Sequence, residues 1–154
     1  MLLGMTPLHW KIVVDCADPH AQAAFWAGAL GYVVEDNSEL VERLLGAGAL
    51  PPDAVVTARG RPAFRTLQAV RHPDDPVQEG TGTGLGRRLL FQQVPEPKRA
   101  KNRLHLDLHA GPDRRDTEVA RLRDLGATVL REVEEPGTHH VVMADPEGNE
   151  FCVQ

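Results

Sequence analysis

The chain has 154 residues, with 17 lysines and arginines against 22 aspartates and glutamates, so its formal net charge is −5 when histidine is neutral. The length fits one domain, and 42% hydrophobic with 25% charged residues is the composition of a globular protein rather than a disordered one. The negative charge argues against nucleic acid as the main partner, and no apolar run approaches the ~20 residues that a membrane span needs.

Cysteine usage and the N-terminus predict the compartment. Cys16 and Cys152 are the two cysteines, too few for a disulfide scaffold or for a zinc site built from cysteines. Residues 1–5 carry neither a basic region nor a long apolar stretch, so we expect no secretory signal. The sequence therefore predicts a cytoplasmic protein whose partner is a small molecule, not a nucleic acid or a membrane.

The first half of the chain predicts a strand, a helix and further strands. Residues 10–16 alternate as in a strand with one buried face. Asp18 is the expected N-cap of the following helix, Pro19 stands at its first position, and Gly31 is the expected residue after its end. Beyond a second strand that starts at 33, we expect a short helix within 38–50, strands at 54–58, 64–70 and 87–94, and loops at 59–62 and 72–86.

The loop at 72–86, hereafter the glycine-rich loop, fits neither the dinucleotide-binding fingerprint nor the P-loop, because no Gly-Lys-Ser or Gly-Lys-Thr follows. We expect it to be flexible, with a lid over a ligand cavity as its candidate role. The basic residues within 87–103 lack interleaved aromatic residues and are interpreted as a solvated connector.

The pattern restarts in the second half. Residues 103–109 alternate leucine with polar residues, and Leu125-Gly126 repeats Leu30-Gly31 at the end of a helix. Both halves thus contain one strand, one helix and three strands, which predicts an internal repeat. The predicted helix covers about 113–125, later strands cover about 128–133, 139–144 and 149–153, and the modules span about 8–95 and 102–154 with a join at 96–101.

Six segments carry a family resemblance: 14–19, 24–26, 30–32, 82–92, 101–108 and 143–151. Together they resemble glyoxalase-like proteins of the vicinal oxygen chelate superfamily, which includes glyoxalases, bleomycin resistance proteins and dioxygenases. The resemblance implies an α+β fold with two tandem βαβββ modules, whose sheets curl around a shared cavity with the helices outside. It also implies a homodimer.

The resemblance further implies a divalent metal in the cavity, held by the first and last strands of each module and able to stabilise an enolate-like anion. These positions fall on Lys11 and Leu90 in the first module and on His105 and Glu150 in the second. Only His105 and Glu150 are good ligands, because a protonated lysine and a leucine do not coordinate. We therefore do not expect ordinary metal-dependent glyoxalase I activity.

Strand alternation supports this placement independently. If the leucines of 103–109 pack under a helix, the polar residues between them face the cavity, and the same holds for the last strand if its aromatic residue packs under the helix. The residues expected to face the cavity are His105, Asp107, His109, Glu150 and Cys152 in the second module, and Lys11, Val13, Asp15, Leu90 and Gln92 in the first.

Several interactions compete with a metal at this place. Lys11 can form an ion pair with Glu150, which would fill the metal position, or it can bind an anionic ligand or act as an acid or base. His105 can hydrogen-bond Glu150 as a buried polar pair. Cys152 faces the cavity, although an unactivated cysteine is the commoner case.

Three residues outside the main set have alternative roles. One of His139 and His140 should point inward, where it would complete a two-histidine, one-carboxylate metal set with His105 and Glu150. Because the superfamily does not usually take a ligand from that strand, a rim position is the competing interpretation. Trp26 is expected to pack on the outer helix, or to form a dimer contact.

Two functional hypotheses follow. In the first, the protein is a lyase or isomerase of a small oxygenated metabolite, with Glu150 as base or ligand, His105 as ligand or acid, and Lys11 as the partner of a developing oxyanion. In the second, it is a binding protein that sequesters an antibiotic or a metabolite without chemistry. The reduced ligand set favours the second hypothesis, and a compact cluster of these residues would favour the first.

Overall fold

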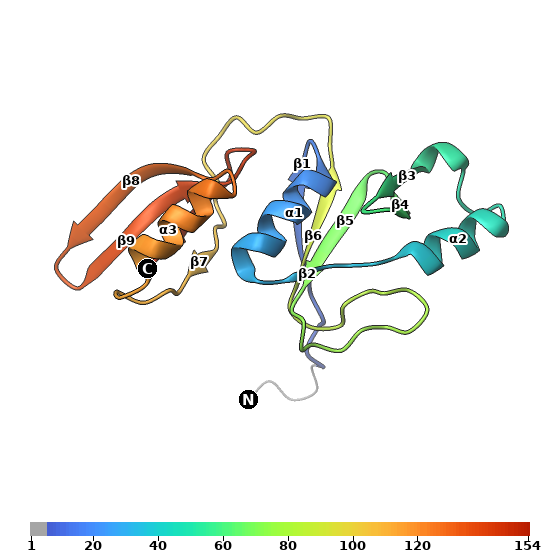
Figure 1. Cartoon of the computed structure of the whole chain (residues 1–154), viewed down its shortest axis with the longest axis horizontal. Helices are drawn as coiled ribbons and strands as arrows, with labels where there is room; N and C mark the ends of the chain where they lie inside the picture. Colours follow the sequence, from blue (N-terminus) through green and yellow to red (C-terminus); the bar gives the residue numbers. More distant parts are fainter. Residues whose placement is uncertain (1–5) are drawn as a thin grey trace.

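Two βαβββ modules follow one another along the chain and lie side by side (Figure 1). The protein is described by a computed structural model that covers residues 6–154, so the expectation about residues 1–5 lies outside the described residues. Within 6–154, no helix is long and apolar enough to cross a lipid bilayer. The predicted α+β class with tandem βαβββ modules is confirmed, and the sheets remain open rather than closing into a barrel.

The first module contains β1 (Ile12–Cys16), α1 (Pro19–Leu30), β2 (Val33–Val34), β5 (Leu67–Arg71) and β6 (Arg88–Gln93). Its sheet has the order β1-β6-β5-β2, in which β1 and β6 are parallel. An insertion between β2 and β5 contains α2 (Ser38–Gly46), the 3-10 turn η1 (Pro52–Ala54), and a hairpin of β3 (Val55–Ala58) and β4 (Arg61–Phe64). Figure 1 shows this insertion on the side of the molecule away from the second module.

The hairpin differs from the prediction, which placed a loop at 59–62 and one strand at 64–70. Arg59 and Gly60 both have positive φ, 53° and 75°, the backbone that a two-residue turn between right-twisted strands requires. The chain therefore turns within two residues, β4 occupies much of the predicted loop, and a separate strand starts at Leu67.

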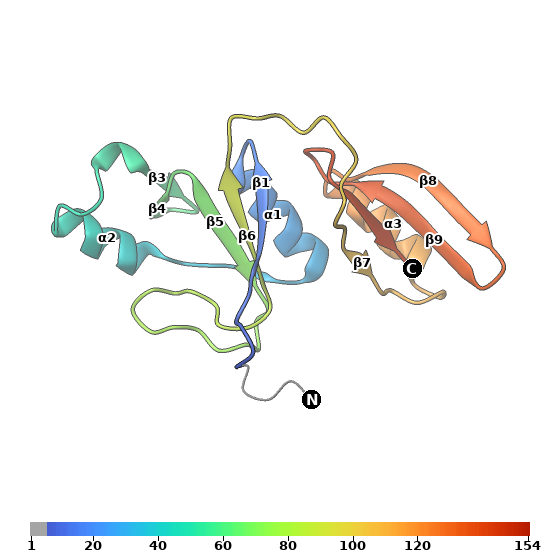
Figure 2. The ribbon, with the colours of Figure 1, turned by 180° about the vertical axis from the view of Figure 1, so that it is seen from behind.

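The second module contains β7 (Asp107–Leu108), α3 (Arg115–Asp124), β8 (Thr128–Glu135), β9 (Thr138–Ala144) and β10 (Glu150–Val153). Its order, β7-β10-β9-β8, repeats that of the first module, with the parallel pair at the same edge. In both modules the helix covers one face of the sheet, and the view from behind in Figure 2 shows the opposite faces.

The ends of α1 follow the predicted capping chemistry. Oδ1 of Asp18 accepts hydrogen bonds from the backbone N–H groups of His20 and Ala21, both at 3.0 Å, which satisfies donors that a helix start leaves unpaired. Gly31 closes the helix with φ 67° and ψ 30°, a left-handed backbone that glycine adopts without strain.

The junction between the modules is built around α1. Trp26 packs against Phe151 of β10 with ring centroids 5.2 Å apart, and its indole N–H donates to Asp145 at 3.1 Å. Arg121 of α3 donates to the carbonyls of Gly28 and Ala29 at 2.7 and 2.9 Å. Trp26 is thus buried between the modules rather than exposed on the outer face, and the two modules share one core.

The glycine-rich loop, which we expected to be flexible, is anchored by charged residues. Asp75 accepts from Nε and Nη2 of Arg87 at 3.0 and 2.7 Å. The buried carboxylate of Glu35 accepts from the N–H of Gly84 at 2.8 Å and from the guanidinium of Arg88 at 2.7 and 2.8 Å. These contacts fix the loop against the first module, so nothing in its structure supports a lid.

Candidate functional site

An open groove of about 1030 Å³ runs along the junction of the two modules. One wall comes from β1 and α1, and the other from the start of β10 and from residues 94–106, the connector between β6 and β7. Both second-module residues of the predicted metal site line this groove. The lining includes Val13, Asp15, Lys98, Asn102, His105 and Glu150.

Glu150, the first residue of β10, is held by the connector. Its Oε2 accepts from the backbone N–H of Asn102 at 2.9 Å and lies 3.3 Å from Nζ of Lys98. The Asn102 N–H lowers the pKa of the Glu150 carboxyl most, Lys98 lowers it further, and desolvation opposes both. Glu150 is therefore an ionised carboxylate with a nearby cation, which makes it a weak base.

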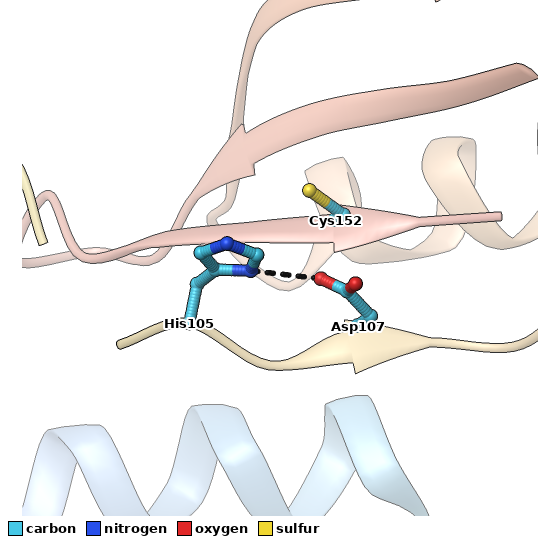
Figure 3. Close-up of side chains that lie close together, drawn as sticks. All are labelled: His105, Asp107 and Cys152. Atoms are coloured by element: carbon cyan, nitrogen blue, oxygen red, sulfur yellow. Dashed lines mark hydrogen bonds and ion pairs between the residues drawn. The ribbon is translucent and has the colours of Figure 1, made fainter. Parts of the chain in front are cut away.

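His105 contacts Asp107 rather than Glu150. Its Nδ1 lies 2.8 Å from Oδ1 of Asp107, and since a carboxylate only accepts, Nδ1–H is the donor of this hydrogen bond. Cys152 stands opposite Asp107 in the β7–β10 register. One donor atom from each of these three side chains lies within 4.8 Å of the others (Figure 3), so the predicted His105–Glu150 hydrogen bond is replaced by a different cluster.

The thiol of Cys152 is not a ready nucleophile. Desolvation raises its pKa most, and the carboxylate of Asp107 raises it further. A reactive cysteine needs the opposite environment, with a cation or a helix N-terminus that lowers the thiol pKa.

The leucines of 103–109 confirm the predicted alternation only in part. Leu106 and Leu108 pack against the core, as expected. Leu104 is 88% exposed, because the regular strand starts only at Asp107 and the preceding chain crosses the groove instead of lying on the sheet.

Lys11 does not join Glu150. It precedes β1 and lines a second, neighbouring groove with His9, Tyr32 and His109, and the ammonium group beside Glu150 belongs to Lys98. The prediction of a Lys11–Glu150 pair is therefore corrected.

The strand register explains this difference. Val13 pairs with Leu90 across β1 and β6. Lys11 therefore lies two residues before the partner of Leu90 and outside the paired part of β1. In the second module the β7–β10 pairing starts at Asp107 and Cys152, so His105 and Glu150 both lie before it.

Neither His139 nor His140 reaches this groove, as far as residues 6–154 describe its lining. Nδ1 of His139 accepts from Arg115 at 2.6 Å and its Nε2–H donates to Glu132 at 2.7 Å. His140 hydrogen-bonds Thr138 at 3.2 Å. The predicted two-histidine, one-carboxylate set is therefore not formed.

A family model described as "Glyoxalase-like domain" matches residues 11–154. The chain belongs to this glyoxalase-like family. No curated protein matches the chain. The match covers both modules and the connector, and it includes every residue of the groove lining described above except Trp10.

Solved structures share the fold of this glyoxalase-like chain. The fosfomycin resistance protein FosX from Mesorhizobium loti is 12% identical, with TM-score 0.58 over 100% of this chain and 92% of that chain. A glyoxalase/bleomycin resistance protein/dioxygenase family enzyme from Burkholderia phytofirmans is 14% identical, with TM-score 0.56 over 93% and 94%. A mutant FosX from Listeria monocytogenes, in complex with Mn(II) and 1S,2S-dihydroxypropylphosphonic acid, is 10% identical, with TM-score 0.55 over 100% and 90%.

The four ligand positions that the family resemblance implied do not fit a metal in this chain. Lys11 lines the neighbouring groove, and Leu90 has no donor atom. Glu150 is paired with Lys98 through Oε2. Among the described residues, the histidine, cysteine and carboxylate side chains that gather closely enough to hold an ion are His105, Asp107 and Cys152, two of which were predicted only as cavity-facing residues.

Sequence reasoning missed the contribution of the connector. Lys98 and Asn102 hold the Glu150 carboxylate, and Arg99 and Arg103 also line the groove, whereas the basic residues of this region were interpreted as solvated. The sequence did contain one indication of this role. These basic residues lie between two predicted modules, and a short connector between modules that share a core must pass over their junction.

Proposed function

We propose that this chain binds a small, oxygenated, anionic molecule in the groove between its modules. The proposal rests on the positive charge that the connector brings to one wall of the groove, where Lys98, Arg99 and Arg103 line it. The facing wall includes Trp10 and Val13, which offer apolar surface. Ligand sites combine such apolar walls with a few polar groups that fix orientation.

Two acidic residues of the groove are already occupied by protein donors. Glu147 accepts from the backbone N–H groups of Ala17 and Asp18 at 2.6 and 3.1 Å. Asp145 is buried and accepts from the indole N–H of Trp26 and from the backbone N–H of Asn149. These carboxylates hold the modules together. Asp15 and Glu96 also line the groove, and among the ion pairs of the described residues Lys98 is the groove cation that is engaged, by Glu150, so Arg99 and Arg103 are the candidate contacts of an anionic ligand.

Binding without proton abstraction by Glu150 is the function that this geometry supports best. A general base needs a pKa near the working pH, and the contacts of Glu150 lower its pKa instead. A role of the bleomycin-resistance type, in which the protein sequesters its ligand, therefore agrees with the site.

A second candidate, a lyase or isomerase, rests on His105. The carboxylate of Asp107 accepts from Nδ1–H at 2.8 Å and so orients an imidazole that lines the groove. An oriented imidazole of this kind can abstract a proton from a bound ligand.

The experiment uses fosfomycin, a small epoxide phosphonate, because fold relatives of this chain are fosfomycin resistance proteins. We expect saturable binding in calorimetry and a thermal shift that grows with fosfomycin concentration. Phosphorus NMR of the mixture separates the two candidates, since sequestration leaves the epoxide intact and an enzyme opens it. Other small anions complete the panel.

Variants identify the binding wall. Arg103→Ala should weaken binding about tenfold, as expected for one lost charge-assisted contact. Lys101→Ala is the matched control, because Lys101 belongs to the same connector and, within residues 6–154, is not part of the groove lining. Absence of binding to every member of the panel, or an equal loss in both variants, would contradict the proposal.

A further inference from the structure

We propose that His105, Asp107 and Cys152 form a binding site for Zn²⁺ or a similar borderline divalent cation. The three side chains lie on one face of the second sheet, at the parallel pair of β7 and β10 (Figure 3). One donor atom from each lies within 4.8 Å of the other two. This site shares His105 with the metal position that the family implies, but it uses neither Glu150 nor any residue of the first module.

The backbone holds this cluster in place. Cys152 donates its N–H to the carbonyl of Leu106 at 2.9 Å, and Gln154 donates to the carbonyl of Leu108 at 2.9 Å. These bonds fix the two strands in register, so Asp107 and Cys152 lie side by side. Two of the three ligands thus stand on paired strands, which position a site more rigidly than loops do, and His105 is joined to them by its hydrogen bond to Asp107.

The donor spacing suits a tetrahedral cation. Zinc binds sulfur at about 2.3 Å and nitrogen or oxygen at about 2.0 Å, which places neighbouring donors roughly 3.5 Å apart. Donors that lie within 4.8 Å of one another are therefore close to the spacing that such a cation requires. Both His105 and Asp107 are partly exposed, at 43% and 41%, so a cation can enter and a fourth position remains accessible.

The charges favour a cation over a nucleophilic thiol. The neighbour of Cys152 in the register is a carboxylate, Asp107, which repels a thiolate. A dication between them relieves this repulsion and accepts both groups as ligands. In a nucleophilic triad the histidine stands between the nucleophile and the carboxylate, whereas here the carboxylate of Asp107 is itself the cross-strand neighbour of Cys152, so metal binding is the better use of this arrangement.

The chemistry of the donors selects the metal. Thiolate and imidazole favour Zn²⁺ and Co²⁺, whereas Mg²⁺ and Mn²⁺ prefer sites built from oxygen donors. The metal preferred by this site should therefore differ from the Mn(II) found in the complex of the FosX mutant from Listeria monocytogenes. This inference does not depend on the proposed ligand, because it concerns residues of β7, of the adjoining connector and of β10.

The test is calorimetric titration of Zn²⁺ into chelator-treated full-length protein without a histidine tag. We expect one Zn²⁺ per chain with a Kd in the micromolar range or below. With Co²⁺, we expect a thiolate-to-cobalt charge-transfer absorption in the near ultraviolet. Mn²⁺ should bind at least tenfold more weakly than Zn²⁺.

Four variants separate this site from the alternatives. Cys152→Ser should abolish the charge-transfer band, and Cys152→Ser, His105→Ala and Asp107→Asn should each weaken Zn²⁺ binding at least tenfold. Cys16→Ser is the control for the band, and Glu150→Gln is the control for the family position; both should bind Zn²⁺ as the parent does. Circular dichroism establishes that each variant is folded.

Three outcomes would overturn the proposal. The first is no Zn²⁺ binding at millimolar concentration, and the second is unchanged binding in Cys152→Ser. The third is a loss in Glu150→Gln that equals the loss in His105→Ala, which would place the ion at the family position. Fosfomycin binding is measured separately with and without Zn²⁺, so its failure leaves this result intact.

Discussion

Nζ of Lys98 lies 3.3 Å from Oε2 of Glu150, and the pair joins the connector to the first residue of β10. The side chains are 24% and 15% exposed, so the pair is more shielded from water than an ordinary surface ion pair. It neutralises the carboxylate in the groove and holds the connector over the module junction.

A double-mutant cycle with Lys98→Met and Glu150→Gln should therefore measure a coupling free energy of about 1 kcal/mol. Urea unfolding of the four proteins gives this value. The exposed pair of Arg114 and Glu118 on α3 is the control, with an expected coupling of about 0.3–0.5 kcal/mol. A coupling for Lys98 and Glu150 no larger than the control would show that the pair does not hold the connector.

Trp26→Phe should destabilise the protein by about 1–3 kcal/mol, because it leaves the buried carboxylate of Asp145 without its indole donor. Trp10→Phe is the control, since Trp10 is 78% exposed and its loss should change stability by less than about 0.5 kcal/mol. Tryptophan fluorescence reports the same difference. Emission of the Trp10→Phe variant should come from a buried indole, and equal effects of the two substitutions would argue against the junction described here.

Gly82→Ala tests the anchoring of the glycine-rich loop. Gly82 has φ +71°, and a Cβ there would lie 1.9 Å from the carbonyl oxygen of Asp36. Since the backbone must move, we expect the free energy of unfolding to fall by about 1–3 kcal/mol. Gly46→Ala meets open space at the end of α2 and should be neutral or stabilising by up to about 1 kcal/mol. Equal melting temperatures for both variants would show that the loop is mobile.

Local sequence patterns predicted much of the fold. Asp18, Pro19 and Gly31 act within a few residues of themselves, and the structure confirms their capping roles. Alternation also placed Phe151 and Val153 in the core and turned Cys152 to the other face, because side-chain direction in a strand depends only on residue parity.

The site depended on long-range geometry that a sequence pattern does not contain. Motif spacing placed Lys11 at a ligand position beside Leu90, but in the register of β1 and β6 the partner of Leu90 is Val13, and Lys11 lies before β1. The partner of Glu150 is Lys98, whose position depends on how an irregular connector crosses the junction. Such a contact joins residues that are far apart in the chain, so neither periodicity nor composition indicates it.

The pH dependence of the glycine-rich loop follows from Asp75. Hydrogen bonds from Arg87 hold the pKa of the Asp75 carboxyl far below its ordinary value. A folded-state pKa that is depressed contributes stability above the unfolded pKa, about 3.9, and this contribution is lost as the pH falls below that value. The protection factors of the loop amides, which compare the measured exchange rate with the intrinsic rate at the same pH, should therefore fall between about pH 4 and pH 2 in the parent. Asp75→Asn should exchange fast already at pH 6, and a parent loop that is equally protected at both pH values would contradict this.

Thiol reactivity should distinguish the two cysteines of the metal-free protein. Burial raises the pKa of the Cys16 thiol to about 12, with nearby carboxylates such as Glu147 adding to the shift. The folded state holds this thiol neutral, so its contribution to stability is complete below the unfolded pKa of about 8.5 and declines as the pH rises toward 12. At pH 8, a disulfide reagent should modify Cys152, which is partly exposed, and should reach Cys16 only after unfolding. The Cys152→Ser variant should show no native-state reaction, and rapid modification of Cys16 in that variant would mean that the junction core opens readily.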